Sequence, residues 1–299
     1  MTLFTSSLTL ALAFLQAPPS PDYRRDLLLV GPDPVVAAAD RAWRRRDEGR
    51  VGARASSKRI NEAIAGYQKA AESPSHVEAR WKLARALFFR AKYTGLAPQS
   101  QLANFLEARV AGEEAIALLR GAAGTRGAAL SADATPRRVA EALSRDPNAA
   151  PTYFWTAVAW GEWGLLASRL QATKAGAAMH VRDYSATVIA LDPTFEEGGG
   201  YRILGRLHHR APRVPYVTGW VSRAEGIRNL RLAVKVAPRN FVNRHFLAQA
   251  LADRRGAGKA EAIRIEKEIL ADAPSPGHLV EDTSIQAEAK RNLAAWGGG

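Results

Sequence analysis

The stretch "EEGGGYRILGRLHHRAPR", Glu196–Arg213, decides the fold because it joins a glycine cluster to a helical pattern. Apolar and small residues follow the three glycines at the spacing of one helix face, and Pro212 ends the run. Two interpretations of the glycines compete. Such a cluster can cradle a phosphate at a helix N-terminus, or it can form a hinge between two packed helices.

The residues around this stretch form one unit of a repeat. The tetratricopeptide pattern is W-x₂-L-G-x₂-Y in a first helix, then A-x₃-F and a proline that closes a second helix. Four residues occupy the first-helix positions: Tyr201, Leu204, Gly205 and His208. The histidine stands in place of the last aromatic residue of the pattern. The second helix of the unit carries Gly226, Leu230, Ala233 and Pro238.

A second unit follows with the same internal spacing. Pro238 lies 12 residues after Gly226 (238 − 226), and Pro274 lies 12 residues after Ala262 (274 − 262). A matching second helix near the N-terminus carries Ala63, Tyr67, Ala70 and Pro74. Because Ala, Leu, Arg and Glu dominate most of the chain, we predict an all-α fold. The repeat predicts a tetratricopeptide-like helical-hairpin solenoid of about four or five hairpins, in which each hairpin buries its core against its neighbours.

The repeat favours the hinge interpretation of the glycines. Gly198 and Gly199 fall between a helix that ends near Pro193 and the next first helix. Glycine there permits a positive φ and a tight reversal. A dinucleotide site needs a preceding strand and G-x-G-x-x-G spacing, and the sequence has neither.

Composition narrows the class of protein. The chain has 299 residues, 47% hydrophobic and 24% charged, so it can bury a sizeable core. It contains no cysteine, which excludes disulfides, cysteine-ligated zinc, cysteine nucleophiles and a lipidated N-terminal cysteine. A net charge of +13 fits either a nucleic-acid or anionic-membrane partner or a solvated basic surface. Acids are interleaved with the basic residues, so we favour the solvated surface and expect no nucleic-acid partner.

The N-terminus has the apolar run of a secretory signal. We assign residues 1–20 to a signal segment, with Ala17 as the small residue at its cleavage site. The segment lacks a positive n-region and Pro18 would hinder cleavage, so a buried N-terminal helix is the alternative. Residues 21–299 are predicted to form a single helical-repeat domain, in which the Gly/Ala-rich segment near 121–135 is a flexible insertion.

The middle of the chain carries three motifs in a fixed order. An aromatic helix contains Phe154, Trp155, Trp160, Gly161 and Trp163. A glycine segment follows with Asp192, Pro193, Phe195, Gly198, Gly199, Leu204, Gly205, Ala211 and Pro212. The last motif contains Ala237, Pro238, Asn243, Arg244, Leu247 and Ala248. This order resembles the T-component (TatT) family associated with tripartite ATP-independent periplasmic (TRAP) transporters.

The resemblance implies a function as well as a fold. Members of the family have a cryptic tetratricopeptide fold, associate with a periplasmic solute-binding protein, and in at least one case form a trimer whose subunits contain hydrophobic channels. It implies a non-catalytic periplasmic accessory component, a hydrophobic small-molecule ligand and a homo-oligomer. Family members are often lipoproteins, whereas this chain has no cysteine to lipidate. A general tetratricopeptide scaffold for envelope protein assembly, without a ligand, is the alternative.

The tryptophans of the aromatic helix are the first candidate site. Trp160 and Trp163 are helical neighbours, whereas Trp155 points about 140° away from Trp160. Packing in the core is one interpretation, and lining a hydrophobic channel is the other. For the channel we favour Trp160 or Trp163, because Gly161 and Gly164 beside them leave space that a tight core would fill.

Other candidate partner contacts lie outside that helix. They are Tyr201 on the glycine-motif helix, and Arg213, Tyr216 and Trp220 in the loop that follows it. His208 and His245 can meet between hairpins, but no third ligand at suitable spacing accompanies them, so we predict no metal site. The chain has no G-x-S-x-G, H-E-x-x-H or P-loop motif. We therefore expect no enzyme activity and no cofactor.

Overall fold

A computed structural model describes residues 33–215, 217–254 and 256–297 of the chain. These residues form 13 helices and no strand longer than an isolated bridge between Val51 and Arg54, so the predicted all-α class is confirmed. The helices are α2 (Pro34–Arg44), α3 (Ser57–Ala71), α4 (Val77–Tyr93), α5 (Pro98–Thr125), α6 (Pro136–Leu143), α7 (Ala149–Leu166), α8 (Arg169–Lys174), α9 (Ala177–Leu191), α10 (Phe195–Arg210), α11 (Arg223–Val236), α12 (Phe241–Ala252), α13 (Ala257–Ala271) and α14 (Leu279–Trp296). The expected signal segment, residues 1–20, lies outside the described residues.

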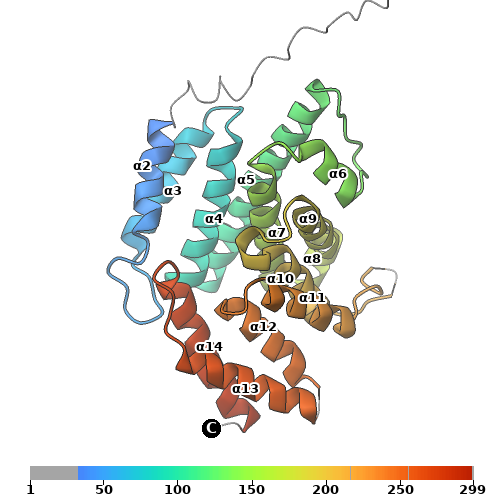
Figure 1. The fold of residues 1–299 in the computed structure, drawn as a ribbon. Coiled ribbons are helices and arrows are strands. Elements are labelled where there is room, and N and C mark those ends of the chain that lie inside the picture. Colours follow the sequence, from blue (N-terminus) through green and yellow to red (C-terminus); the bar gives the residue numbers. More distant parts are fainter. Residues whose placement is uncertain (1–32, 216, 255, 298–299) are drawn as a thin grey trace, which may run out of the picture. The chain divides into compact units, whose positions relative to one another are not determined.

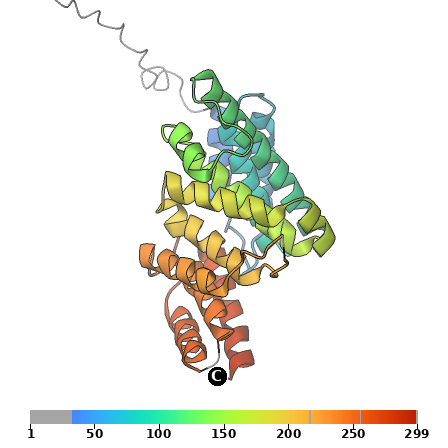
Figure 2. The same cartoon turned by 90° about the vertical axis from the view of Figure 1, so that its right-hand side faces the viewer.

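Most helices pack in consecutive pairs (Figures 1 and 2). The pairs are α2/α3, α4/α5, α7/α9, α10/α11 and α12/α13, while α14 packs against α13 and α12. Each pair also contacts the next, through α3/α4, α5/α7, α9/α10 and α11/α12. The array curves back on itself, because α14 contacts α4 (Figure 1) and Arg46 donates hydrogen bonds to Glu281 and to the Gly277 carbonyl.

Polar residues set the helix starts. The side chain of Ser222 accepts a hydrogen bond from the backbone N–H of Glu225 at the start of α11, and that of Asn240 accepts one from Asn243 N–H at the start of α12. Pro98 and Pro136 stand in the first turns of α5 and α6, where a missing N–H costs nothing.

Small residues let paired helices approach closely. A Cβ atom added to Gly205 on α10 would lie 2.6 Å from Cγ of Leu230 and 3.0 Å from the carbonyl oxygen of Gly226 on α11. A Cβ atom on Gly66 of α3 would likewise lie 2.7 Å from Cβ of Ala39 on α2. The Gly205 and Gly226 positions of the sequence pattern are thus the points where α10 and α11 cross.

The glycine cluster combines a hinge with close packing. The backbone is left-handed at three successive residues, with φ of 48° at Glu196, 58° at Glu197 and 80° at Gly198, and this turn breaks the start of α10. The expected positive φ is confirmed at Gly198. Gly199 instead makes room for a neighbour, because its Cβ would lie 2.3 Å from Cε2 of Phe154.

The segment assigned to a flexible insertion is partly helical. Helix α5 continues to Thr125, so residues 121–125 belong to it rather than to a loop. The reason is packing: Ala123 is fully buried in a cluster with Leu119, Val139 and Leu143. Residues 126–135 then lead into α6.

Candidate binding cleft

A cleft of about 660 Å³ lies between the hairpins. That volume falls within the range of about 300–1,000 Å³ typical of small-molecule sites. Helices α2, α4, α7, α10, α12 and α14 supply most of its lining, with contributions from α8, the start of α9 and the loop 211–218. Among the described residues none from α3, α5, α11 or α13 lines it. The first helix of each pair thus faces the cleft, and of the second helices in the described chain only α9 contributes, through its first turns.

One wall of the cleft is aromatic. The Trp155 ring lies 4.9 Å from that of Phe154 and 5.7 Å from that of Phe88, measured between ring centroids, and all three residues line the cleft. Trp155 is half-buried, and its indole Nε1 is buried without a hydrogen-bond partner in the described part of the chain. Val242 and Phe246 of α12 add further apolar lining.

The other two tryptophans of α7 belong to a closed cluster. Trp160 and Trp163 are 6% and 8% exposed, and the Arg109 guanidinium lies 4.3 Å from the centroid of each ring. His180 stacks on Trp160 at 4.3 Å, and the Trp160 indole N–H donates to Glu113 Oε1 at 2.5 Å. Trp160 is the member of this cluster that also lines the cleft. Trp163, the other tryptophan predicted to line a channel, is not part of the lining.

Arginines line the cleft beside the aromatic wall, where the Arg202 guanidinium lies 5.7 Å from the Phe154 ring centroid. Arg202, Arg206 and Arg210 follow one another at four-residue spacing along α10, and all three line the cleft. That spacing places them on one face of a helix. Arg85 of α4 is a fourth arginine in the lining. We refer to Arg202, Arg206 and Arg210 as the arginine stripe.

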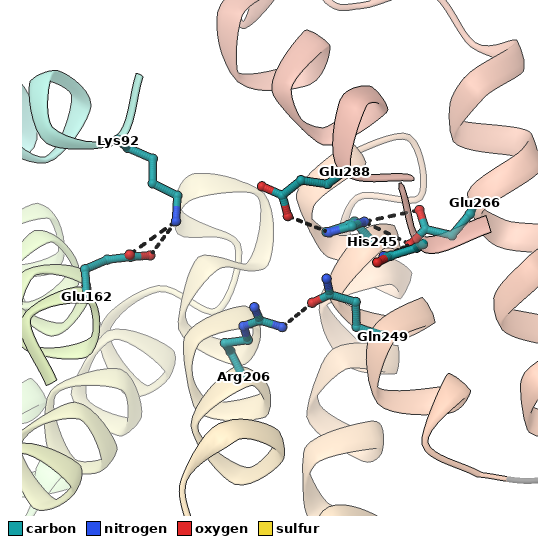
Figure 3. Close-up of polar contacts among 8 residues, drawn as sticks. Lys92, Glu162, Arg206, His245, Gln249, Glu266 and Glu288 are labelled. Atoms are coloured by element: carbon teal, nitrogen blue, oxygen red, sulfur yellow. Dashed lines mark hydrogen bonds and ion pairs between the residues drawn. The ribbon is translucent and has the colours of Figure 1, made fainter. Parts of the chain in front are cut away.

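The more deeply placed arginines have neutral partners. Arg202 Nη1 donates to the Glu196 carbonyl oxygen at 3.1 Å and to Asn243 Oδ1 at 2.9 Å. Arg206 donates to Gln249 Oε1 (Figure 3). It also lies over the Phe246 ring, 4.2 Å from its centroid. Neither forms an ion pair with a carboxylate within the described ranges.

Arg85 is held in the same way. Its guanidinium lies 4.0 Å from the Trp43 ring centroid, Nη2 is 3.4 Å from the Tyr67 hydroxyl, and Nε is buried without a partner among the described residues. Burial lowers the pKa of Arg85 and Arg202, and the charge of Glu196 only partly opposes this. Burial and the neighbouring Arg210 lower the pKa of Arg206 to about 10.

Several cleft carboxylates, by contrast, have cationic partners. Arg46 Nη2 lies 2.8 Å from Glu281 Oε1, and Lys92 Nζ lies 3.2 Å from Glu162 Oε2. Glu288 accepts from His245 (Figure 3). The arginines of the stripe, like Arg85, form no such ion pair within the described residues, although Glu196 and Glu197 act on Arg202 through their charge.

His245 ties three helices together beside the cleft. Its Nδ1 lies 3.0 Å from Glu266 on α13 and its Nε2 lies 3.1 Å from Glu288 on α14 (Figure 3). The side chains of His245 and Glu266 are fully buried. Burial acts to lower the pKa of His245, but the hydrogen bonds to both glutamates outweigh it, and the net pKa is raised.

The histidines considered for a metal site lie apart in the structure. His208, the proposed companion of His245, instead accepts a hydrogen bond from Ser222 N–H at 3.1 Å and packs edge-on against Trp220. Over the ranges that the structure describes, no group of three or more His, Asp or Glu side chains is arranged to hold a metal ion.

The motif pair Asn243 and Arg244 has a structural position. Asn243 is fully buried, and its Nδ2 donates to the carbonyl oxygens of Glu197 and Ala233, at 2.9 and 3.0 Å. It therefore holds the left-handed turn of α10 and the end of α11 against α12. Arg244 donates to Asp272 at the end of α13 at 2.7 Å. Pro193 and Pro238 lie in the α9–α10 and α11–α12 turns.

The remaining candidates lie at or beyond the rim. Arg213 is exposed and donates to the Gly219 carbonyl, and Trp220 donates to the Val217 carbonyl. Tyr201 is half-buried and outside the lining. Tyr216 lies outside the described residues. Of this loop, Val214, Val217 and Thr218 reach the cleft.

Sequence reasoning did not single out Arg85 or the arginine stripe. The four-residue spacing of Arg202, Arg206 and Arg210 was visible, but charged residues at that spacing usually mark a solvated face. Which face of α10 meets the cleft depends on where Gly205 meets α11, and that contact needs the three-dimensional structure.

Comparisons add no family name to this geometry. Neither a protein-family model nor a curated protein matches the chain. None of the helices in the described residues combines the length and the apolar character required to cross a bilayer.

Proposed function

We propose that this chain is a non-catalytic ligand-binding protein with a tetratricopeptide-like solenoid, acting as a periplasmic accessory component of a TRAP-type transport system. The observation that carries the ligand-binding part is the cleft of about 660 Å³ with an aromatic wall. Its lining by the first helix of each pair supports the solenoid, because stacked hairpins present one helix of each repeat on their concave surface. The three motifs that resemble the TatT family support the transport role.

Filling the cleft tests ligand binding. Gly161 lines the cleft, and a Cβ atom added to it would meet only Val181 Cγ2, at 3.9 Å. Gly161→Leu therefore puts a side chain into the cleft without a clash at Cβ. The matched control is Gly121→Leu, also on a helix but exposed, where a Cβ atom meets nothing within 4 Å.

The measurement is a titration with the neutral fluorescent probe N-phenyl-1-naphthylamine. We expect saturable binding to the wild type and to Gly121→Leu, and at least tenfold weaker binding to Gly161→Leu. Absence of saturable binding to the wild type, or equal binding to both variants, would reject the cleft as a ligand site.

The transport role needs a separate test. Crosslinking in the native cell envelope, followed by purification of this chain, should recover a solute-binding protein encoded beside a TRAP transporter. Recovery of other envelope proteins without a solute-binding component would favour the alternative, a scaffold for envelope assembly.

A further inference from the structure

We infer that the cleft binds an anionic amphiphile, with the acidic head group held by the arginine stripe and the apolar tail against the aromatic wall around Trp155. The inference rests on the proposed ligand-binding function and adds the chemical class of the ligand.

The donors of the stripe are available. Both hydrogen bonds of Arg202 use Nη1, so Nε and Nη2 have no partner in the described part of the protein. Arg206 uses one nitrogen, Nη1, for Gln249 (Figure 3). Arginine presents its donors in a planar fork that matches the oxygens of a carboxylate or phosphate.

The charge arrangement favours an anion over a cation. A buried cation needs a counter-charge, and like charges one helical turn apart repel each other. Arg202 and Arg206 are placed in that unfavourable way, while Glu162, Glu281 and Glu288 already have Lys92, Arg46 and His245 as partners. A bound anion would relieve the repulsion within the stripe. Two lining carboxylates that have no ion pair among the described residues, Glu196 and Glu197, already act electrostatically on Arg202, so a bound cation would compete with that arginine for them.

The apolar part of the ligand is defined by the aromatic wall, which begins beside the stripe, because the Arg202 guanidinium lies 5.7 Å from the Phe154 ring centroid. Phe88, Phe154 and Trp155 present contiguous rings, and Val242 and Phe246 extend the apolar surface from α12. Phe246 also carries the Arg206 guanidinium on its face. The surface that would bind the apolar tail and the guanidinium that would bind the acidic head group therefore meet at Phe246, as an amphiphile requires.

Displacement of N-phenyl-1-naphthylamine by ligands with one tail and different heads tests the inference. The ligands are dodecanoate, dodecyl phosphate, dodecanol and dodecyltrimethylammonium, all below their critical micelle concentrations. We expect both anions to displace the probe from the wild type at concentrations at least tenfold lower than dodecanol does. Comparison of dodecanoate with dodecyl phosphate then distinguishes a carboxylate from a phosphate head.

Two variants locate the head group. Arg206→Gln should reduce the advantage of the anions over dodecanol to less than threefold and leave dodecanol unchanged. Arg210→Gln, at an exposed position, should produce a smaller loss and provides a second test if Arg206→Gln does not fold. The control is Arg231→Gln on the outer helix α11, where Arg231 pairs with Glu261, and it should behave as wild type.

The outcomes separate the two claims. Equal displacement by dodecanoate and dodecanol, stronger displacement by dodecyltrimethylammonium, or an equal loss in Arg231→Gln would overturn the anionic ligand and leave the proposed function in place. Failure of the neutral probe itself to bind would instead reject the proposed function.

Discussion

Two neighbouring charged regions, the His245 cluster and the arginines of α10, differ in whether their charges have ion-pair partners (Figure 3). At the junction of α12, α13 and α14, both ring nitrogens of His245 lie next to carboxylates, and the side chains of His245 and Glu266 are fully buried. On α10, Arg202 and Arg206 have aromatic rings and neutral acceptors but no carboxylate partner within the described residues. The first arrangement is complete within the chain. The second lacks an ion-pair partner among the described residues and lines a cleft.

The contrast distinguishes charges that stabilise the fold through ion pairs from charges that remain available to bind a ligand. A buried ion pair that is satisfied makes its partners depend on one another, and removal of one partner is destabilising. A buried charge without a partner does not stabilise the fold in this way. Natural proteins contain such unfavourable arrangements mainly at functional sites. Helix α7 shows the same division, with Trp163 in a closed cluster and Trp155 in the open cleft.

The largest expected effect sharpens this division on α7. Trp163→Ala should lower the free energy of unfolding by about 3–5 kcal/mol, because it removes a buried ring that packs against Trp160 and Arg109. Trp155→Ala enlarges a cleft that already exists, so its cost should be less than about 3 kcal/mol while probe binding changes. Urea denaturation followed by circular dichroism measures both. An equal loss in the free energy of unfolding for the two variants would contradict the distinction between the two faces of α7.

The next effect concerns the closed charge cluster. His245→Gln leaves the fully buried Glu266 without its cation, and a glutamine can restore only part of the hydrogen bonding. We expect a loss of about 3 kcal/mol near pH 6. A matched control is Lys92→Gln, which breaks the partly exposed pair with Glu162 and should cost less than about 1 kcal/mol.

The contribution of His245 should also depend on pH. Its raised pKa means that the stabilisation is fully present below the ordinary value of 6.5 and is lost as the pH rises through the raised value. The pKa of Glu288 is lowered, mainly by the hydrogen bond from His245. On the acid side, the stabilisation is therefore lost as the pH falls from the ordinary glutamate value of 4.5 through the lowered value. The difference between wild type and His245→Gln should therefore be greatest between about pH 4.5 and 6.5. A difference that grew from pH 7 to pH 9 would show that His245 is not a stabilising cation.

How much of this was visible in the sequence differs between the two regions. The helix pairs followed from residue spacing, and the crossing of α10 and α11 was correctly marked by Gly205 and Gly226. The His245 cluster was not predicted, because its members are 21 and 43 residues apart on three helices. No local pattern joins such residues, and only the stacking of hairpins brings them together.

The cleft was predicted in part, for a similar reason. Glycines beside aromatic residues on α7 indicated an available space, and Gly161 and Gly164 do line it. The choice between Trp155 and Trp163 depended on which side of α7 meets α5 and α9, since both of those helices pack against it. Helical spacing gives the angle between side chains, but it does not give the direction of the neighbouring helix.

The smallest effect is the one that tests the contrast most directly. The folded-state pKa of Arg206 is lowered from its ordinary value to about 10, which means that its charged form is less favourable in the folded protein than in the unfolded chain at neutral pH. Removing the charge therefore relieves a cost, while loss of the Gln249 hydrogen bond and the Phe246 contact opposes the gain. Arg206→Gln without ligand should change the free energy of unfolding at pH 7 by no more than about 1 kcal/mol, in either direction. Urea denaturation beside His245→Gln provides the comparison. A loss as large as that of His245→Gln would make Arg206 a structural residue like His245, and the two charged regions would no longer differ in kind.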